Sequence, residues 1–373
     1  MFAAVVGSCG GSSYEYLTPL ETGDGWETAS LSEVGLKAEP FERLMTHIED
    51  NPDRAVHGIL VVREDKLVLE EYFDGYRFAY EDPEFRGEPI EFDATTRHNL
   101  MSVTKAVTGA IVGIAIDDGL IASVDDEVLD DFPEYASLAD EATDRITVEH
   151  LLTMTSGLQW NEWDVPLTDT DRNDLIQLFI VDDPIEYILT KPVSHEPGIF
   201  WYYSGGDVNL LGEFFERATG TPIDEFSQTQ FFDPLGITDY QWHYINSEIV
   251  YASGELEMRP RDLAKFGSLY LNDGQWNGTE VLPAWWVEES IDEKVSMPGR
   301  AADGDGYGYQ WFTDTYEHES QTIDAAIRTG WGGQALVLFP TLDTLIVVTG
   351  GDYLQRSQVS ELIEQHVLPA VNQ

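Results

Sequence analysis

Runs of strand-forming residues gather near the two ends of this chain, and this distribution limits the folds open to it. Two runs lie early, at 58–63 and 67–73, and the charged residues 64–66 between them predict a hairpin. Four runs lie late, at 307–313, 325–329, 335–339 and 344–349. Since strands need partners for their backbone groups, we expect one antiparallel sheet built from both chain ends.

The middle of the chain carries helical patterns instead. Apolar spacing predicts helices at 101–118, 148–154, 174–189, 208–218 and 261–271. Two more helices are predicted beside the strand runs, at 38–48 and 359–367. The expected fold class is α+β, an antiparallel sheet flanked by helices with an inserted, mostly helical domain.

These patterns divide the chain into three parts. Residues 1–35 are interpreted as a signal remnant followed by a tether rich in Gly, Ser, Thr and Glu. Residues 36–97 and 256–373 together form the predicted sheet domain, and residues 98–255 form the inserted helical domain. Within the first sheet segment, the polar and charged residues 76–97 predict a loop.

The charge of the chain excludes several classes of partner. Lys and Arg number 20 and Asp and Glu number 69, which gives a net charge of −49. Nucleic acids and anionic membrane surfaces would repel such a chain, so neither is an expected partner. No stretch of about eighteen consecutive apolar residues occurs, so no transmembrane helix is expected.

The single cysteine, Cys9, excludes an internal disulfide and resembles a targeting signal. Small residues precede it after a short apolar run, as in the lipobox of a prokaryotic lipoprotein, although no basic residues come before the run. We therefore expect an exported protein, periplasmic or at the cell surface, with a lipid anchor on Cys9. The alternative is an incidental cysteine at a frayed terminus.

Several motifs of other enzymes are missing from the sequence. It contains no Gly-x-Ser-x-Gly elbow, no His-Glu-x-x-His pair, and no Walker or dinucleotide-binding glycine pattern. The eight histidines are scattered singly. We therefore expect no metal and no organic cofactor, and the sequence leaves the oligomeric state open.

Ser102 and Lys105 form a Ser-x-x-Lys pair at the start of an apolar helix. Residues three apart on a helix share one face, so the serine Oγ and the lysine Nζ can meet. A serine hydroxyl becomes a good nucleophile only when a base takes its proton, and burial lowers the pKa of a lysine. The pair therefore predicts Ser102 as a nucleophile and Lys105 as its base.

A second segment carries a family resemblance. Pro197 and Gly198 open an aromatic run that ends at Tyr203, followed by Ser204 and Gly205. Together with the Ser-x-x-Lys pair, this resembles the serine β-lactamase and penicillin-recognising family, closest to class C β-lactamases, family VIII esterases and 6-aminohexanoate-oligomer hydrolases. The resemblance spans residues 36–370 and implies a β-lactamase-like fold with Tyr203 beside the serine and lysine. Gly205 stands where the family usually has an Asn that hydrogen-bonds the lysine and the substrate amide. We expect another residue of this chain to make these hydrogen bonds.

The third element of that family has two registers here. Arg328-Thr329-Gly330 imitates Lys-Thr-Gly, whereas Trp331-Gly332-Gly333 falls where some relatives have His-Gly-Gly. We favour the second register, because the strand left before Pro340 then has an ordinary length. A strand N–H there and that of Ser102 would form the oxyanion hole. Arg328, if it faces the site, would offer a carboxylate clamp.

The sequence allows less specific predictions for other polar and aromatic residues near these motifs. Trp160 and Trp163 follow a Ser-Gly turn, and we expect them either to line the substrate pocket or to pack elsewhere. Asp207 and Asn209 are interpreted as residues that cap the helix after Tyr203.

The resemblance implies a serine hydrolase that forms an acyl-enzyme on Ser102 and cleaves ester or amide bonds of small substrates. Trp331 supplies neither a cation nor a hydroxyl for a β-lactam carboxylate, which favours a carboxylesterase. The alternatives are a hydrolase of linear amides such as 6-aminohexanoate oligomers, and a penicillin-binding DD-peptidase or weak β-lactamase. A non-catalytic surface binding protein is a further alternative, since fold does not fix function, but Ser102, Lys105 and Tyr203 count against it.

The charge imbalance generates a prediction about stability. With 69 carboxylates against 20 basic residues, screening by salt should relieve self-repulsion in the folded chain. The thermal midpoint of unfolding should therefore rise from low to molar NaCl, and KCl should act alike. Midpoints that stay flat or fall in both salts would contradict this prediction.

Overall fold

The structure of the protein is a computed structural model that describes residues 14–138, 140–301, 304–355 and 357–371. Cys9 and the predicted lipobox lie outside the described residues, so lipidation and export stay predictions. Across the ranges described, none of the helices combines the length and the apolar character needed to cross a bilayer.

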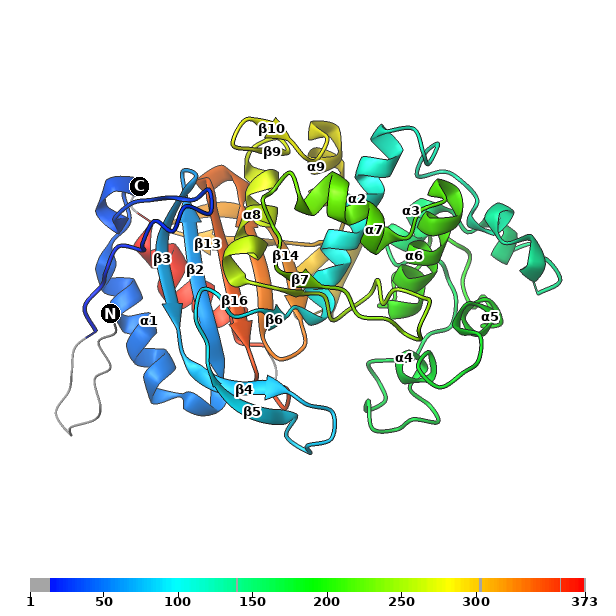
Figure 1. Cartoon of the computed structure of the whole chain (residues 1–373), viewed down its shortest axis with the longest axis horizontal. Coiled ribbons are helices and arrows are strands. Elements are labelled where there is room, and N and C mark those ends of the chain that lie inside the picture. Colours follow the sequence, from blue (N-terminus) through cyan, green and yellow to red (C-terminus); the bar gives the residue numbers. More distant parts are fainter. Residues whose placement is uncertain (1–13, 139, 302–303, 356, 372–373) are drawn as a thin grey trace.

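A nine-stranded sheet forms the body of the fold (Figure 1), in the order β1-β3-β2-β16-β15-β14-β13-β12-β11. The strands from the first part of the chain are β1 (Glu27–Thr28), β2 (Val56–Arg63) and β3 (Lys66–Tyr72). Those from the last part are β11 (Val295–Ala301), β12 (Gly304–Tyr307), β13 (Phe312–His318), β14 (Gln321–Gly330), β15 (Gln334–Phe339) and β16 (Thr344–Gly350). β2 pairs with β16 and joins the two chain ends, which confirms the predicted origin of the sheet. The sheet is mixed rather than purely antiparallel, because β1 pairs with β3 in parallel.

Both faces of the central strands are buried, and alternate residues serve different cores. Ile59 and Val61 of β2 pack with α1 (Ala38–Asp50) and with the C-terminal turns α10 (Val359–Leu362), η9 (Ile363–Val367) and η10 (Leu368–Ala370). Leu60 and Val62 pack on the opposite side with α8 (Pro260–Leu271). This burial on both faces explains why the strands read as continuous apolar runs.

The chain between β5 and β11 supplies most of the helices (Figure 1). They are α2 (Thr104–Asp117), α3 (Val148–Leu152), α4 (Asp174–Gln177), α5 (Pro184–Leu189), α6 (Gly205–Thr219), α7 (Ile223–Ser227), α8 and α9 (Ala284–Ile291). Short strands β6 (His98–Asn99), β7 (Tyr240–Gln241) and β8 (Glu257–Met258) form a small separate sheet, and β9 (Gln275–Trp276) pairs with β10 (Thr279–Glu280). The α+β class with a helical insertion is confirmed, and the three domain boundaries stay predictions.

Two segments differ from what the sequence predicted near the N-terminus. Residues 76–97, expected as a loop, contain most of a hairpin of β4 (Asp74–Phe78) and β5 (Arg86–Glu91). Residues 14–35, expected as part of a tether, lie against the sheet instead: Trp26 and Leu31 are buried, and Tyr16 donates a hydrogen bond to the Val68 carbonyl at 2.8 Å. Aromatic side chains within this polar segment therefore attach it to the sheet.

Two predicted elements are broken in the structure. The helix predicted at 174–189 is divided into α4 and α5, because Asp183 caps a new helix that begins at Pro184. The strand predicted at 307–313 is divided into β12 and β13 by a turn in which the Gly308 N–H bonds the Trp311 carbonyl at 2.8 Å.

Helix α2 is buried along almost its whole length and is the central helix of the insertion. It approaches α9 at Gly113, where a Cβ atom would lie 2.3 Å from the Trp286 ring. One turn earlier, a Cβ on Gly109 would meet its nearest neighbour, Gln310, at 3.4 Å, an ordinary contact.

Replacing glycine by alanine should therefore have different effects at these two positions of α2. Gly113→Ala should lower the free energy of unfolding by ~1–3 kcal/mol, because the methyl group overpacks the contact with Trp286. Gly109→Ala, the matched control, should leave stability unchanged or raise it by up to ~1 kcal/mol through helix propensity. Urea denaturation of both variants would measure the difference, and equal effects would contradict the close contact.

Candidate active site

The structure brings the predicted nucleophile and base together. Ser102 lies in the single turn η3 (Met101–Val103), which runs directly into α2, where Lys105 is the second residue. The Lys105 Nζ donates a hydrogen bond to the Ser102 Oγ at 2.9 Å. Met101 adopts a positive φ of 47°, an uncommon conformation that an unbranched residue tolerates at some cost and that often marks functional sites.

Lys105 is almost completely buried, with 2% of its surface exposed. Burial lowers its pKa from 10.5 to about 7; the Glu162 carboxylate opposes this shift and the Arg328 guanidinium adds to it. A pKa near 7 leaves a large fraction of the amine neutral at neutral pH. The lysine can therefore accept a proton from Ser102.

Tyr203 lies beside this pair, as the family resemblance implied. Its side chain is 7% exposed, and the Lys105 Nζ lies 5.0 Å from the centre of its ring. Arg328 Nη2 donates a hydrogen bond to the Tyr203 Oη at 3.3 Å. This bond and the contact with Lys105 hold the Tyr203 side chain at the centre.

Arg328 faces the centre, but its guanidinium is bound by protein groups. It is fully buried, and Nε donates to the Ser102 carbonyl at 2.8 Å while Nη1 donates to the Tyr307 Oη and the Gln310 carbonyl at 2.8 and 3.0 Å. With Nη2 directed to Tyr203, these bonds hold the fork in place. The arrangement differs from the exposed carboxylate clamp that the sequence suggested.

Gly205 is the first residue of α6, and the space beside it is filled by Glu162. The Gly205 N–H donates to Glu162 Oε2 at 2.7 Å, and a Cβ atom on residue 205 would lie 2.7 Å from the same oxygen. Trp160 Nε1 also donates to this oxygen, at 2.6 Å. Glu162 could not be predicted from the sequence, because no spacing rule connects it with Lys105.

Ser253 and Asn209 are further residues at the centre that the sequence analysis missed or misread. Lys105 Nζ donates to the Ser253 carbonyl at 2.5 Å. Asn209, expected as a cap, lies inside α6 and holds Ser253 through two bonds, Nδ2 to Oγ at 3.0 Å and the Ser253 N–H to Oδ1 at 3.2 Å. Asp207 does belong to the start of α6, where its N–H bonds the Oγ of the capping residue Ser204 at 3.0 Å.

The end of β14 lies against the nucleophile turn. A Cβ atom on Gly330 would lie 2.6 Å from the Leu100 carbonyl, which shows how closely the strand approaches. Trp331, Gly332 and Gly333 form the turn into β15, with the Gly333 N–H bonded to the Gly330 carbonyl at 3.2 Å. The strand after Gly333 begins at Gln334, and the register of the third family element stays a prediction. Which N–H serves an oxyanion hole stays a prediction.

The tryptophans proposed to line the site have different surroundings. The Trp331 ring lies 4.7 Å from Phe85 and 4.9 Å from Tyr353, in an aromatic cluster with the β4–β5 hairpin. Trp160 is buried against the start of α6. Trp163 is 65% exposed and meets the Tyr203 ring edge-on at 4.9 Å, so it is the tryptophan that borders the centre from solvent.

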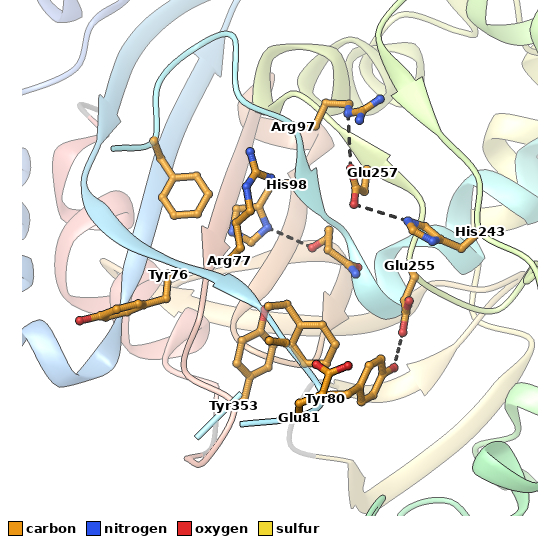
Figure 2. Close-up of a pocket in the computed structure, with 14 residues that line it drawn as sticks. Tyr76, Arg77, Tyr80, Glu81, Arg97, His98, His243, Glu255, Glu257 and Tyr353 are labelled. Carbon is orange, nitrogen blue, oxygen red and sulfur yellow. Dashed lines mark hydrogen bonds and ion pairs between the residues drawn. The ribbon is translucent and has the colours of Figure 1, made fainter. Parts of the chain in front are cut away.

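A cavity of about 280 Å³ adjoins the nucleophile turn under the β4–β5 hairpin (Figure 2). Asn99 lines it and accepts a hydrogen bond from the Met101 N–H at 2.8 Å. Figure 2 shows Glu257 between Arg97 and His243, and Glu255 bonded to Tyr80. Its walls also include the aromatic rings of Tyr76, Phe78, Phe92 and Tyr353.

A second cavity, of about 500 Å³, lies next to the aromatic run that contains Tyr203. Trp160, Lys191, Tyr202 and Ser204 are among the residues that line it. Ser102 lines neither of these two cavities, and its side chain is partly exposed, unlike those of Met101 and Val103. Within the ranges that the structure describes, no group of three or more His, Cys, Asp or Glu side chains could hold a metal ion.

This chain is similar in sequence to a known protein family and to several characterised proteins. A profile of the Beta-lactamase family matches residues 41–353. The lovastatin esterase of Penicillium rubens is 30% identical over 194 residues, which are 47% of this chain and 46% of that protein, so the match spans less than half of either. The 6-aminohexanoate-dimer hydrolase of Paenarthrobacter ureafaciens is 28% identical over 331 residues, 83% of this chain and 78% of that protein.

A solved structure of a family VIII carboxylesterase shares the fold, with a TM-score of 0.65 at 18% identity over 89% of this chain and 98% of that one. Together with the family profile, which spans most of the sequence, this likeness confirms the resemblance carried by the Ser-x-x-Lys pair and the Tyr203 segment. The chain belongs to the β-lactamase family.

Proposed function

We propose that this protein is a serine hydrolase that forms an acyl-enzyme on Ser102 and cleaves small esters. The observation that carries the proposal is the hydrogen bond of 2.9 Å between Lys105 Nζ and Ser102 Oγ in a setting that lowers the lysine pKa to about 7. A nucleophile in contact with a base whose pKa matches neutral pH is the requirement for acyl transfer.

In the proposed mechanism, neutral Lys105 accepts the Ser102 proton as Oγ attacks the carbonyl carbon of the substrate. We assign Tyr203 a share of this role because the family resemblance implies it and its ring lies 5.0 Å from Lys105 Nζ. The proton then passes to the leaving alcohol or amine as the acyl-enzyme forms. In the second half, the same two side chains take a proton from the water that hydrolyses the acyl group, and Ser102 is restored.

The environment of Arg328 supports esters over β-lactams as substrates. Recognition of a β-lactam carboxylate needs a cation or hydroxyls beside the nucleophile, but Arg328 donates to Ser102, Tyr307, Gln310 and Tyr203, and Trp331 bonds the Tyr353 carbonyl at 2.9 Å. The cavity near Asn99 combines aromatic rings with the charged side chains of Arg97 and Glu257, and its volume suits a compact group of a small substrate. A hydrolase of linear amides is the second candidate, favoured by the 6-aminohexanoate-dimer hydrolase that matches 83% of the chain.

Ser102→Ala should abolish hydrolysis of a short-chain p-nitrophenyl ester while the fold persists, since Oγ is the attacking atom. Ser32→Ala, an exposed serine far along the chain from the site, is the matched control and should retain full activity. A fluorophosphonate probe should label the native protein and not the Ser102 variant. Activity near that of the native protein in Ser102→Ala would remove this residue from the mechanism. A panel with a chromogenic cephalosporin, a D-amino-acid amide and a linear aminohexanoate dimer would rank the alternatives.

Tyr203→Phe should lower kcat roughly 10²-fold or more with little change in KM, because the ring and its packing remain while the proton-transfer hydroxyl is lost. Lys105→Ala should be similarly damaging, and the double variant should lose far less than the product of the two effects, because the two groups act as one unit. A double-mutant cycle on kcat with one ester measures this. A Tyr203→Phe enzyme within a few-fold of native would exclude the role and direct attention to Tyr202.

A further inference from the structure

Glu162 belongs to the loop that follows α3, and its carboxylate reaches the start of α6. Its Oε2 accepts hydrogen bonds from Trp160 Nε1 at 2.6 Å and from the Gly205 N–H at 2.7 Å. The second donor is the first amide of a fifteen-residue helix, whose N-terminus favours a negative charge. The carboxylate is therefore fixed by two donors rather than free to move in solvent.

The absence of a side chain at residue 205 is what makes room for this carboxylate. A Cβ atom there would lie 2.7 Å from Glu162 Oε2, but 3.1 and 3.3 Å from Leu175 and Ser253, which could yield by a few tenths of an ångström. A side chain at residue 205 would therefore require the Glu162 carboxylate to move from its present place. In this chain the polar group beside residue 205 is the carboxylate of Glu162.

The carboxylate also acts on the catalytic lysine. It is the largest influence that raises the Lys105 pKa against burial, and Lys105 in turn lowers the pKa of Glu162, which burial raises. Among the ion pairs of the described residues, none joins the two directly. The other charged or titratable groups that face the pair are Arg328 of β14, Tyr203 and Tyr202 before α6, Asp207 in α6, and Tyr251.

We propose that Glu162 is a positioning residue of the Ser102 centre. Its carboxylate lies where a side chain of residue 205 would otherwise lie, and from there it stabilises the protonated form of Lys105. The inference rests on the proposed function, because it assigns a role to the lysine of that mechanism. Among the hydrogen bonds of the described residues, none joins Glu162 to Ser102, so Glu162 acts through Lys105.

A purely structural role is the competing explanation, since Glu162 also holds Trp160 and the start of α6. Glu162→Gln separates the two. Its amide oxygen can keep both hydrogen bonds, which share one oxygen in the native protein, while the negative charge is lost. A structural role predicts an unchanged pH profile for this variant, whereas the positioning role predicts a shifted one.

The expected direction follows from the titration of Lys105. The lysine must be neutral to accept a proton, so kcat/KM falls as the pH drops through its pKa, about 7 in the native protein. Removing the neighbouring negative charge lowers that pKa further, so the acid limb of Glu162→Gln should move to lower pH by about one unit. Asp164→Asn, which removes a carboxylate from the same loop that bonds Tyr202 instead, should leave the limb in place.

A reciprocal exchange tests the shared volume. Gly205→Asn should lower the thermal midpoint and the activity, because its Cβ would clash with Glu162. Glu162→Ala should lower kcat roughly ten-fold or more. The double variant Glu162→Ala with Gly205→Asn should regain at least roughly ten-fold over Glu162→Ala alone, because the amide enters the vacated volume and restores a polar partner near Lys105. Thermal melting of all variants would separate loss of fold from loss of rate.

An acid limb of Glu162→Gln that coincides with the native one would overturn the inference, and so would a double variant no faster than Glu162→Ala. Either result would leave the proposed function standing if Ser102→Ala is inactive. Conversely, an active Ser102→Ala enzyme would overturn the proposed function itself, whatever the Glu162 variants do.

Discussion

The burial of Lys105 is the constraint on which the rest of the centre depends. An unpaired ammonium removed from water is costly, so the lysine either finds compensating partners or loses its proton. Here both outcomes contribute. Ser102 Oγ and the Ser253 carbonyl accept bonds from Nζ, and burial moves the pKa to about 7. The apolar character of α2, which the sequence shows plainly, is therefore the origin of the chemistry and not only of the packing.

The hydrogen bonds that hold α2 and Lys105 in place come from several parts of the chain. Thr108 Oγ1 donates to the Ala252 carbonyl at 2.7 Å, and Thr104 Oγ1 accepts from the Leu256 N–H at 3.0 Å, so α2 is fastened on both sides of Ser253. Arg328 adds the sheet to this network through the Ser102 carbonyl. Because β14 comes from the C-terminal part of the chain, the centre is complete only when the sheet and the helical insertion pack together.

The sequence predicted the elements whose pattern is local and apolar. The sheet from both chain ends was predictable because β2 and β16 are continuous apolar runs, and Ser102 with Lys105 because helical spacing brings them together. The β4–β5 hairpin was missed because its strands are polar and pair only with each other. Glu162 and Ser253 were missed because loops distant in the sequence bring them to Lys105, and no periodicity records such an approach.

The inward orientation of Arg328 has a consequence for the charge of the substrate. A chain with a net charge of −49 repels anions at long range. At the centre, the guanidinium that could offset this repulsion is fully buried and donates to protein oxygens. The neutral ester proposed above as the substrate would avoid this long-range repulsion. Yet the positive charge held behind Ser102 still favours negative charge that develops on the carbonyl oxygen during attack, since a fixed charge in a poorly hydrated site needs no reorganisation to act.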